Sequence, residues 1–484
     1  MPGLSDKLTP YLYQRHAVER MVNEPAVLLN HVVGAGKTGS MIMGAMELRR
    51  MNLAEKPLMV VPNHLVEQIA REAKQWYPGA NVLSGASARG GKDNRRVFMS
   101  QVATHDWDII VVPESVFKLI PLSPEIESNY IEEQLALMRQ DLETVKEAGG
   151  GHKASVKDIE LHVKKWQEKL NEVSSKVGTD IGVTFDQAGL DYLIVDEAHG
   201  DKNLARRSGM SELAHPGSDK ATDMDMKMAY LRSIKEPGRP PATVATGTPS
   251  ANNLAEIWVM QRYLRPDLLH EARVYGVNSW AINFTEPVTE IGFTAGGAIK
   301  EQTKVSSYVN VGDLARMCTP FIDYVGRDQI SAKLPEIVEG RTQTVEFDPG
   351  QEVKDFNRDL LWRESKLKQL NNSQIDNPLT LINHGKDATL DPRLAGLDHT
   401  PGVGRIAAIA DNVHELWDEH KDEVYTDQDG QPSPHKGAFQ IVFCDKGVPS
   451  KSDPLKFTIY EALRQELVAK GMDKDRIRFI HDWD

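Results

Sequence analysis

The feature that most constrains this chain is a short apolar stretch that leads into a glycine-containing turn. Ala26 to Leu29 predict a buried strand, and Gly34 to Thr38 form the turn. A helical pattern follows, with apolar residues at Met41, Met43, Ala45, Met46 and Leu48. Strand, glycine turn and helix in this order are typical of a phosphate-binding loop, because the N–H groups of the turn and the helix N-terminus point at one anion.

The residues of the turn suit a nucleotide and its metal. Gly34 and Gly36 let the backbone approach the phosphates closely. Lys37 is predicted to reach the β- and γ-phosphates, and the Thr38 hydroxyl is predicted to hold Mg²⁺. One position departs from the pattern G-x-x-x-x-G-K-[ST], because His31 stands where the first Gly belongs. We predict an ATP and Mg²⁺ site here; a chance turn before a helix is the competing interpretation.

Bulk properties place the chain among soluble globular proteins. Its 484 residues suffice for roughly two to four domains. The net charge of −13 excludes a globally basic nucleic-acid binder, although not a local basic groove. Cys318 and Cys444 lie far apart without metal-ligand spacing, so a reducing interior is expected. No apolar stretch is long enough to cross a bilayer and no signal-peptide core is present, so we expect a cytoplasmic protein without a membrane partner.

Polar residues flank several predicted elements. Residues 8–23 predict a helix, in which the Gln14 amide offers the donor and acceptor needed to read adenine; a surface amide is the alternative. Residues 57–62 and 107–112 predict buried strands, and residues 80–84 a third strand between them. The first two are followed by the pairs Asn63 and His64, and Glu114 and Ser115. The position of Asn63 and His64 at the carboxyl end of a strand suits contact with a nucleic-acid backbone, although a plain helix cap is equally compatible.

Residues 125–175 differ in character from the rest of the first half. Apolar residues follow a seven-residue repeat in two runs, which are Ile131, Leu135, Met138, Leu142 and Val145, then Ile159, Val163, Trp166, Leu170 and Val173. Glycines 149–151 separate the runs. This pattern predicts an antiparallel helical hairpin inserted into an α/β domain.

Two further strands end in residues that carry chemistry. Residues 190–195 predict a buried strand that runs into Asp196, Glu197 and His199. Asp196 is predicted to bind the Mg²⁺ shell, and Glu197 to orient or deprotonate the attacking water. Residues 242–249 form the next strand and turn, where Thr246 and Thr248, together with His199, are predicted to couple the nucleotide pocket to other parts of the domain. A structural histidine is the competing interpretation for His199.

Taken together, these motifs resemble the superfamily 2 helicase-like ATPases, and specifically their Swi/Snf-type DNA translocase branch. Residues 34–38 match motif I, residues 196–199 match the DEAH form of motif II, and residues 246–249 match motif III. The branch-specific extensions match at Lys202, Asn203, Asn252, Asn253, Leu254, Glu256 and Trp258. The chain is also similar to large phage- and plasmid-borne proteins that couple such a motor to a DNA methyltransferase.

The resemblance implies a RecA-like P-loop motor lobe with a parallel sheet, which hydrolyses ATP to move on duplex DNA. Lys37, Asp196 and Glu197 are then catalytic, while Asn63, His64, Glu114 and Ser115 match the DNA-contacting motifs Ia and Ib. DNA is expected to run across the other edge of the same sheet. A fused or associated methyltransferase is a further expected partner.

The second half is expected to hold an incomplete second lobe. We predict a first lobe at 1–266, a linking and helical region at 267–436, and the start of a second RecA-like lobe at 437–484. Strands are expected at 334–339, 342–347, 438–445 and 476–480, and helices at 350–373, 404–417 and 459–467. Motifs V and VI, which include the arginine finger in this family, have no counterpart here. An arginine finger contributes about 10³–10⁵ in rate, so weak turnover is expected.

Two alternatives stay open. The chain could be a nucleotide-dependent DNA-binding or assembly module without motor activity, which its acidic balance favours. It could also be an RNA helicase, although Lys202, Asn203 and residues 252–258 are closer to the duplex-DNA branch.

Overall fold

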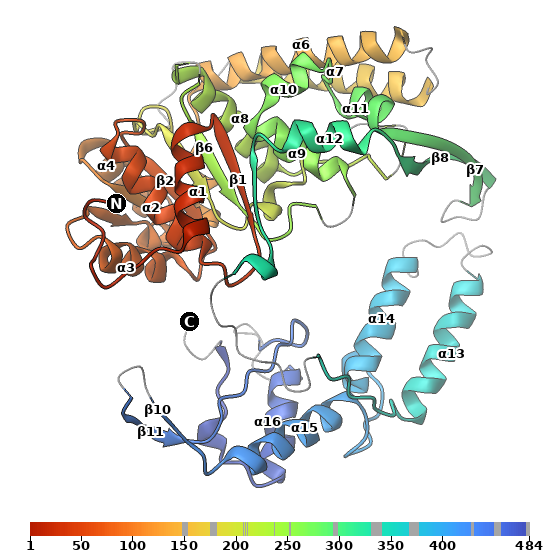
Figure 1. The fold of residues 1–484 in the computed structure, drawn as a ribbon. Coiled ribbons are helices and arrows are strands. Elements are labelled where there is room, and N and C mark those ends of the chain that lie inside the picture. The colour runs from red at the N-terminus through yellow and green to blue at the C-terminus, as the bar shows by residue number, and fades with distance from the viewer. Residues whose placement is uncertain are drawn as a thin grey trace. The chain divides into compact units, whose positions relative to one another are not determined.

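The computed structural model describes residues 1–147, 153–174, 182–206, 208, 210, 212–236, 238–250, 253–293, 299–330, 341–366, 377–426, 430–449 and 456–480. The chain divides into two compact units (Figure 1). The first unit is Met1–Glu290 with Glu301–Leu334, and the second is Ile291–Lys300 with Pro335–Asp484.

A seven-stranded sheet forms the centre of the first unit, in the order β3-β4-β2-β5-β6-β1-β9, and every neighbouring pair is parallel. The strands are β1 (Ala26–His31), β2 (Pro57–Val61), β3 (Val82–Ser84), β4 (Ile109–Pro113), β5 (Tyr192–Val195), β6 (Ala242–Ala245) and β9 (Ile322–Val325). This topology confirms the predicted α/β fold with a RecA-like parallel sheet.

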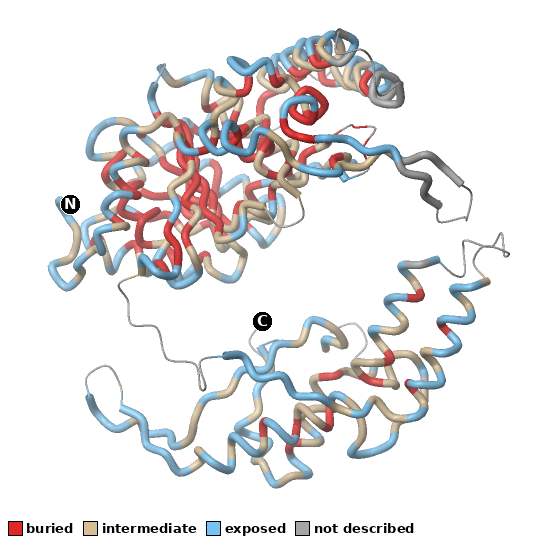
Figure 2. Tube along the Cα trace, turned by 45° about the vertical axis from the view of Figure 1, so that its right-hand side comes forward, coloured by how far each residue is buried: buried red, intermediate tan, exposed pale blue. Residues whose placement is uncertain are grey.

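Helices cover both faces of the sheet, which is why its strands are continuous apolar runs. Along β1, Ala26 and Leu28 join one core while Val27 and Leu29 join the other. The helices α1 (Leu12–Asn23), α2 (Lys37–Arg50) and α3 (Val66–Trp76) pack on one face, and α4 (Lys92–Thr104), α8 (Asp219–Ile234) and α9 (Ala255–Leu264) on the other. Figure 2 shows the buried residues concentrated in this unit.

The predicted helical hairpin is present as α6 (Pro124–Glu147) and α7 (Lys153–Ser174). Lys146 near the end of α6 pairs with Glu160 of α7 at 3.4 Å, and Ile131 packs with Val173, so the two helices run antiparallel. Glycines 149–151, at the predicted turn, lie outside the described residues.

The region after α9 contains structure that the sequence pattern did not reveal. It forms α10 (Pro266–Glu271), α11 (Val277–Phe284), the two-stranded sheet of β7 (Thr285–Phe293) and β8 (Ile299–Tyr308), and α12 (Val311–Cys318). It then supplies β9, which pairs with β1. The four residues of β9 are too few to show a period, and three of them are not fully buried. The compact unit therefore continues beyond residue 266.

Helices predominate in the second unit. They are α13 (Gln351–Lys366), α14 (Pro378–Leu390), α15 (Arg405–His420) and α16 (Ile459–Ala469). Three of them confirm the helices predicted at 350–373, 404–417 and 459–467, with residues 367–373 outside the described part of the chain. The short strands β10 (Val424–Thr426) and β11 (Pro432–Lys436) pair antiparallel.

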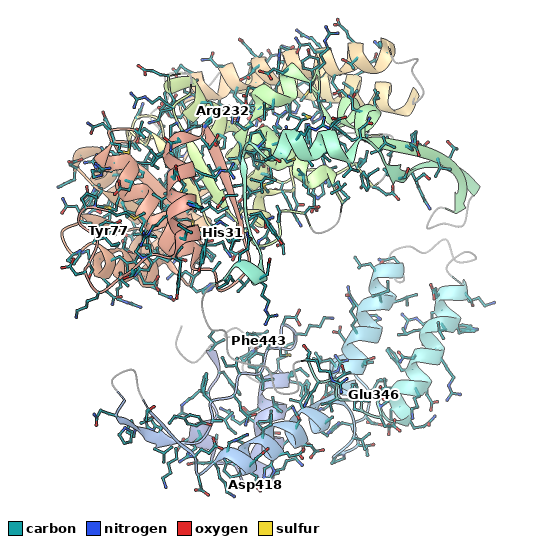
Figure 3. All side chains as sticks on the ribbon, in the orientation of Figure 1. His31, Tyr77, Arg232, Glu346, Asp418 and Phe443 are labelled. Atoms are coloured by element: carbon teal, nitrogen blue, oxygen red, sulfur yellow. The ribbon has the colours of Figure 1, made fainter. Side chains whose placement is uncertain are left out.

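Three predicted strands of the second half are wrong. Residues 342–347, 438–445 and 476–480 form no strand. The prediction puts Phe439 and Phe443 within a buried strand, yet they are 89% and 90% exposed. Figure 3 labels Phe443. An apolar run becomes a buried strand only when neighbouring strands pair with it, and no described residues pair with these segments. The strand predicted at 334–339 lies outside the described residues.

No helix in the described part of the chain combines the length and the apolar character that a bilayer crossing requires.

Candidate nucleotide site

The glycine loop joins the carboxyl end of β1 to the first residue of α2. Gly34 and Gly36 have φ angles of 90° and 72°, in the left-handed region where a side chain is strained. A Cβ on Gly36 would lie 2.7 Å from the Gln14 side-chain nitrogen. Both glycines are therefore required by the backbone, and the loop has the shape of a phosphate cradle at a helix N-terminus.

Two side chains predicted to bind nucleotide contact this loop. Lys37 Nζ donates to the His31 carbonyl oxygen at 3.1 Å, which holds the ammonium against the loop. Gln14 Nε2 donates to the Gly36 carbonyl oxygen at 3.2 Å, and Gln14 Oε1 accepts from the Tyr11 N–H at 2.9 Å. Thr38 is the second residue of α2, directly after Lys37. Gln14, Gly36 and Lys37 thus lie together.

The acidic pair Asp196 and Glu197 follows β5. Strand β6 lies between β5 and β1, and all three are parallel, so the acidic pair and the glycine loop leave the same edge of the sheet. Burial raises the pKa of Asp196, and the neighbouring Glu197 raises it further, whereas the positive charge of Lys37 lowers it. The two predicted halves of the site are therefore close enough to interact electrostatically.

The chemistry of this edge fits Mg²⁺ held mainly through phosphates. Among the described residues, no group of three or more His, Cys, Asp or Glu side chains could hold a metal ion by itself. Mg²⁺ usually takes one or two protein oxygens together with phosphates and water. The Thr38 hydroxyl and the Asp196 carboxylate are such oxygens, and a cation beside Asp196 would favour its ionised form.

Motifs II and III are in direct contact. His199 Nδ1 lies 3.0 Å from Glu197 Oε2 and 3.3 Å from Thr246 Oγ1. Thr246 is buried, and its hydroxyl accepts from the Thr248 N–H at 3.1 Å. The three residues predicted to couple the site to its surroundings therefore form one chain of hydrogen bonds. The branch-specific Lys202 also lies 3.2 Å from Glu256 of α9.

The predicted nucleic-acid contacts follow β2 and β4. Asn63 Oδ1 accepts from the Ser115 N–H at 3.3 Å, so the two motifs touch, and His64 is exposed. Because the sheet is parallel, these residues leave the same edge as the glycine loop, and the expectation of a different edge is corrected. Glu114, on the short helix α5 (Glu114–Phe117), lies 2.9 Å from Lys220 of α8.

Three charged residues beside these motifs carry no signal in the sequence, and they are Asp201, Lys220 and Asp323. Lys220 also approaches Asp201 at 3.4 Å, and thereby joins the turn after motif II to Glu114. In the sequence His31 stands out only as a departure from the loop pattern, and its partner Asp323 lies outside every motif. No sequence signal could have paired them, because each pair joins residues far apart in the chain.

The pH dependence of stability offers a test of the buried carboxyl Asp201. Burial raises its pKa from 3.8 to about 6, despite the opposing effect of Lys220. A carboxyl whose pKa is raised in the folded state binds protons more tightly when folded. Its stabilising contribution is therefore complete below about pH 4 and is lost as the pH rises through about 6. We expect the free energy of unfolding of wild type, relative to Asp201→Asn, to fall by about 3 kcal/mol across this range.

Urea denaturation at each pH measures this difference. The exposed variant Asp313→Asn is the control, and its difference from wild type is expected to stay constant with pH. If the difference in free energy of unfolding between wild type and Asp201→Asn also stays constant with pH, the pKa of the Asp201 carboxyl is not raised by folding.

A phosphate-binding loop and an acidic pair at one edge of a parallel sheet define a P-loop domain with a RecA-like fold. The chain belongs to the family described as "Probable helicase domain", whose model matches residues 21–326. This match ends one residue after β9. It confirms the predicted relationship to helicases.

Individual relatives are distant. The chain is 24% identical over 363 residues to "Defense against restriction protein B" of Escherichia phage P1. The aligned region covers 65% of this chain and 16% of the phage protein. A SWI2/SNF2 ATPase core of Sulfolobus solfataricus, solved with double-stranded DNA, is 14% identical with a TM-score of 0.38, covering 86% of this chain and 66% of that one. The Hef helicase domain of Pyrococcus furiosus is 12% identical with a TM-score of 0.28, covering 53% and 37%. The chain thus spans about a sixth of the phage protein.

Proposed function

We propose that this chain is the ATP-hydrolysing lobe of a DNA translocase of the Swi/Snf type. The observation that carries the proposal is the convergence of the Lys37 loop and the Asp196–Glu197 pair at one edge of the sheet, where Lys37 lowers the pKa of Asp196. Membership of a helicase family supports it.

Each residue of the site has a role in this proposal. The loop N–H groups and Lys37 bind the β- and γ-phosphates, while Thr38 and Asp196 hold Mg²⁺, which neutralises charge on the phosphates. Glu197 orients or deprotonates the attacking water. Its backbone is left-handed, with φ of 50°, a conformation that is costly outside glycine and is often found at functional sites. Gln14 reads adenine.

Coupling to DNA runs through the neighbouring loops. Asn63, His64, Glu114 and Ser115 contact the backbone of duplex DNA in this proposal, because they follow β2 and β4 at the same edge of the sheet, in the strand order β4-β2-β5. The contacts of His199 Nδ1 with Glu197 and with Thr246 carry a change at the phosphates toward motif III. A fused or associated DNA methyltransferase remains a further prediction about the partner.

ATP hydrolysis with and without duplex DNA tests the proposal. We expect hydrolysis that duplex DNA stimulates, although turnover by this chain alone is expected to be weak. Affinity for DNA should fall with salt, because phosphate contacts release counterions. The variant His64→Ala should weaken binding, with Glu132→Gln on the exposed face of α6 as the control.

Other outcomes separate the alternatives. Nucleotide-dependent DNA binding without any hydrolysis would favour a binding or assembly module. Preference for RNA in competition with DNA would favour an RNA helicase. Absence of ATP binding would overturn the proposal.

A further inference from the structure

A buried histidine occupies the first position of the phosphate-binding loop. His31 is 0% exposed and ends β1 (Figure 3). Its Nε2 lies 2.6 Å from Oδ2 of Asp323, a residue of β9 whose side chain is 15% exposed. A buried imidazole needs a hydrogen-bond partner, and here a carboxylate almost 300 residues away supplies it.

Strand β9 is itself held by hydrogen bonds from α1. The Arg20 guanidinium donates to the carbonyl oxygens of Ile322, Pro320 and Thr319 at 2.7, 2.9 and 3.1 Å. It also lies 3.5 Å from Asp323 Oδ1. The Asp323 carboxylate therefore sits between a guanidinium and an imidazole, so its position is determined from two sides.

The same histidine meets the nucleotide machinery through its backbone. The His31 carbonyl oxygen accepts the bond from Lys37 Nζ at 3.1 Å, and the next residue, Val32, donates from its N–H to the Val325 carbonyl oxygen at 3.0 Å. At the other end of the loop, Gln14 of α1 holds the Gly36 carbonyl. Helix α1 and strand β9 thus fix both ends of the loop.

We propose that His31 and Asp323 form a positioning pair that holds the start of the phosphate-binding loop, and with it Lys37, in the geometry that receives a triphosphate. A glycine at this position has no side chain to anchor. The histidine adds a side-chain hydrogen bond to Asp323 of β9. This bond makes the edge strand β9 part of the nucleotide site. This inference rests on the proposed function for its ligand, but its structural half does not.

Hydrogen–deuterium exchange without nucleotide tests the structural half. We expect Asp323→Ala to raise the exchange rate of the amides of residues 32–36 by about tenfold or more, because the loop loses its anchor. Asp323→Asn keeps an acceptor for His31 and should restore most of the protection. The exposed Asp313→Ala is the matched control. Unchanged exchange in Asp323→Ala would overturn the proposal.

Binding of MgATP to the same proteins tests the ligand half. We expect the affinity of Asp323→Ala to fall about tenfold, with Asp323→Asn closer to wild type. Faster exchange with unchanged affinity would overturn the positioning role and leave a purely structural bond. If wild type itself binds no MgATP while exchange still rises in Asp323→Ala, the proposed function fails but the anchoring of the loop stands.

Discussion

We expect Glu197→Gln to lower the rate of ATP hydrolysis by about 10²- to 10⁴-fold, the contribution typical of a positioned general base. The amide is nearly the same size as the carboxylate but does not accept a proton from water. The loop, Lys37 and Asp196 are unchanged, so affinity for MgATP should stay close to that of wild type. Steady-state hydrolysis with duplex DNA and titration with a fluorescent ATP analogue measure the two quantities separately.

Two comparison variants sharpen this result. Lys37→Ala should lose nucleotide affinity as well as hydrolysis, because it removes the charge that meets the phosphates. Glu132→Gln, the same change on an exposed part of α6, should behave as wild type. If Glu197→Gln hydrolyses ATP within about threefold of wild type, well inside the range expected for a catalytic base, Glu197 does not have the proposed role.

The second large effect concerns stability. Asp225 of α8 is 1% exposed and accepts hydrogen bonds from the Tyr130 hydroxyl at 2.6 Å and from Arg262 Nε and Nη2 at 3.0 and 2.6 Å. It therefore joins the hairpin helix α6 to α8 and α9. Asp225→Ala leaves the Arg262 guanidinium buried without its carboxylate, and we expect the free energy of unfolding to fall by about 3–5 kcal/mol.

Chemical denaturation followed by circular dichroism measures this loss. Asp313→Ala is the control, because it breaks an ion pair with Arg316 in which both side chains are exposed, and such pairs contribute about 0–1 kcal/mol. A loss below about 1 kcal/mol for Asp225→Ala would mean that water or another group replaces the carboxylate.

Local patterns in the sequence determined much of the first unit. An apolar run followed by Gly36 and Lys37, or by Asp196 and Glu197, predicts a strand and the loop at its end, because strand burial and loop chemistry are both encoded within a dozen residues. The hairpin was also predictable, since its seven-residue repeat extends over many turns. The order of motifs then indicated the family that the comparison established.

Only the tertiary structure decided the features that depend on distant partners. Asp323 reaches His31 because β9 pairs with β1, and Asp225 contacts both Tyr130 and Arg262 because three helices meet on it. The segment around Phe443 has the composition of a buried strand but is exposed. Composition sets what a segment can bury, whereas its burial requires neighbouring strands or helices that the segment itself does not encode.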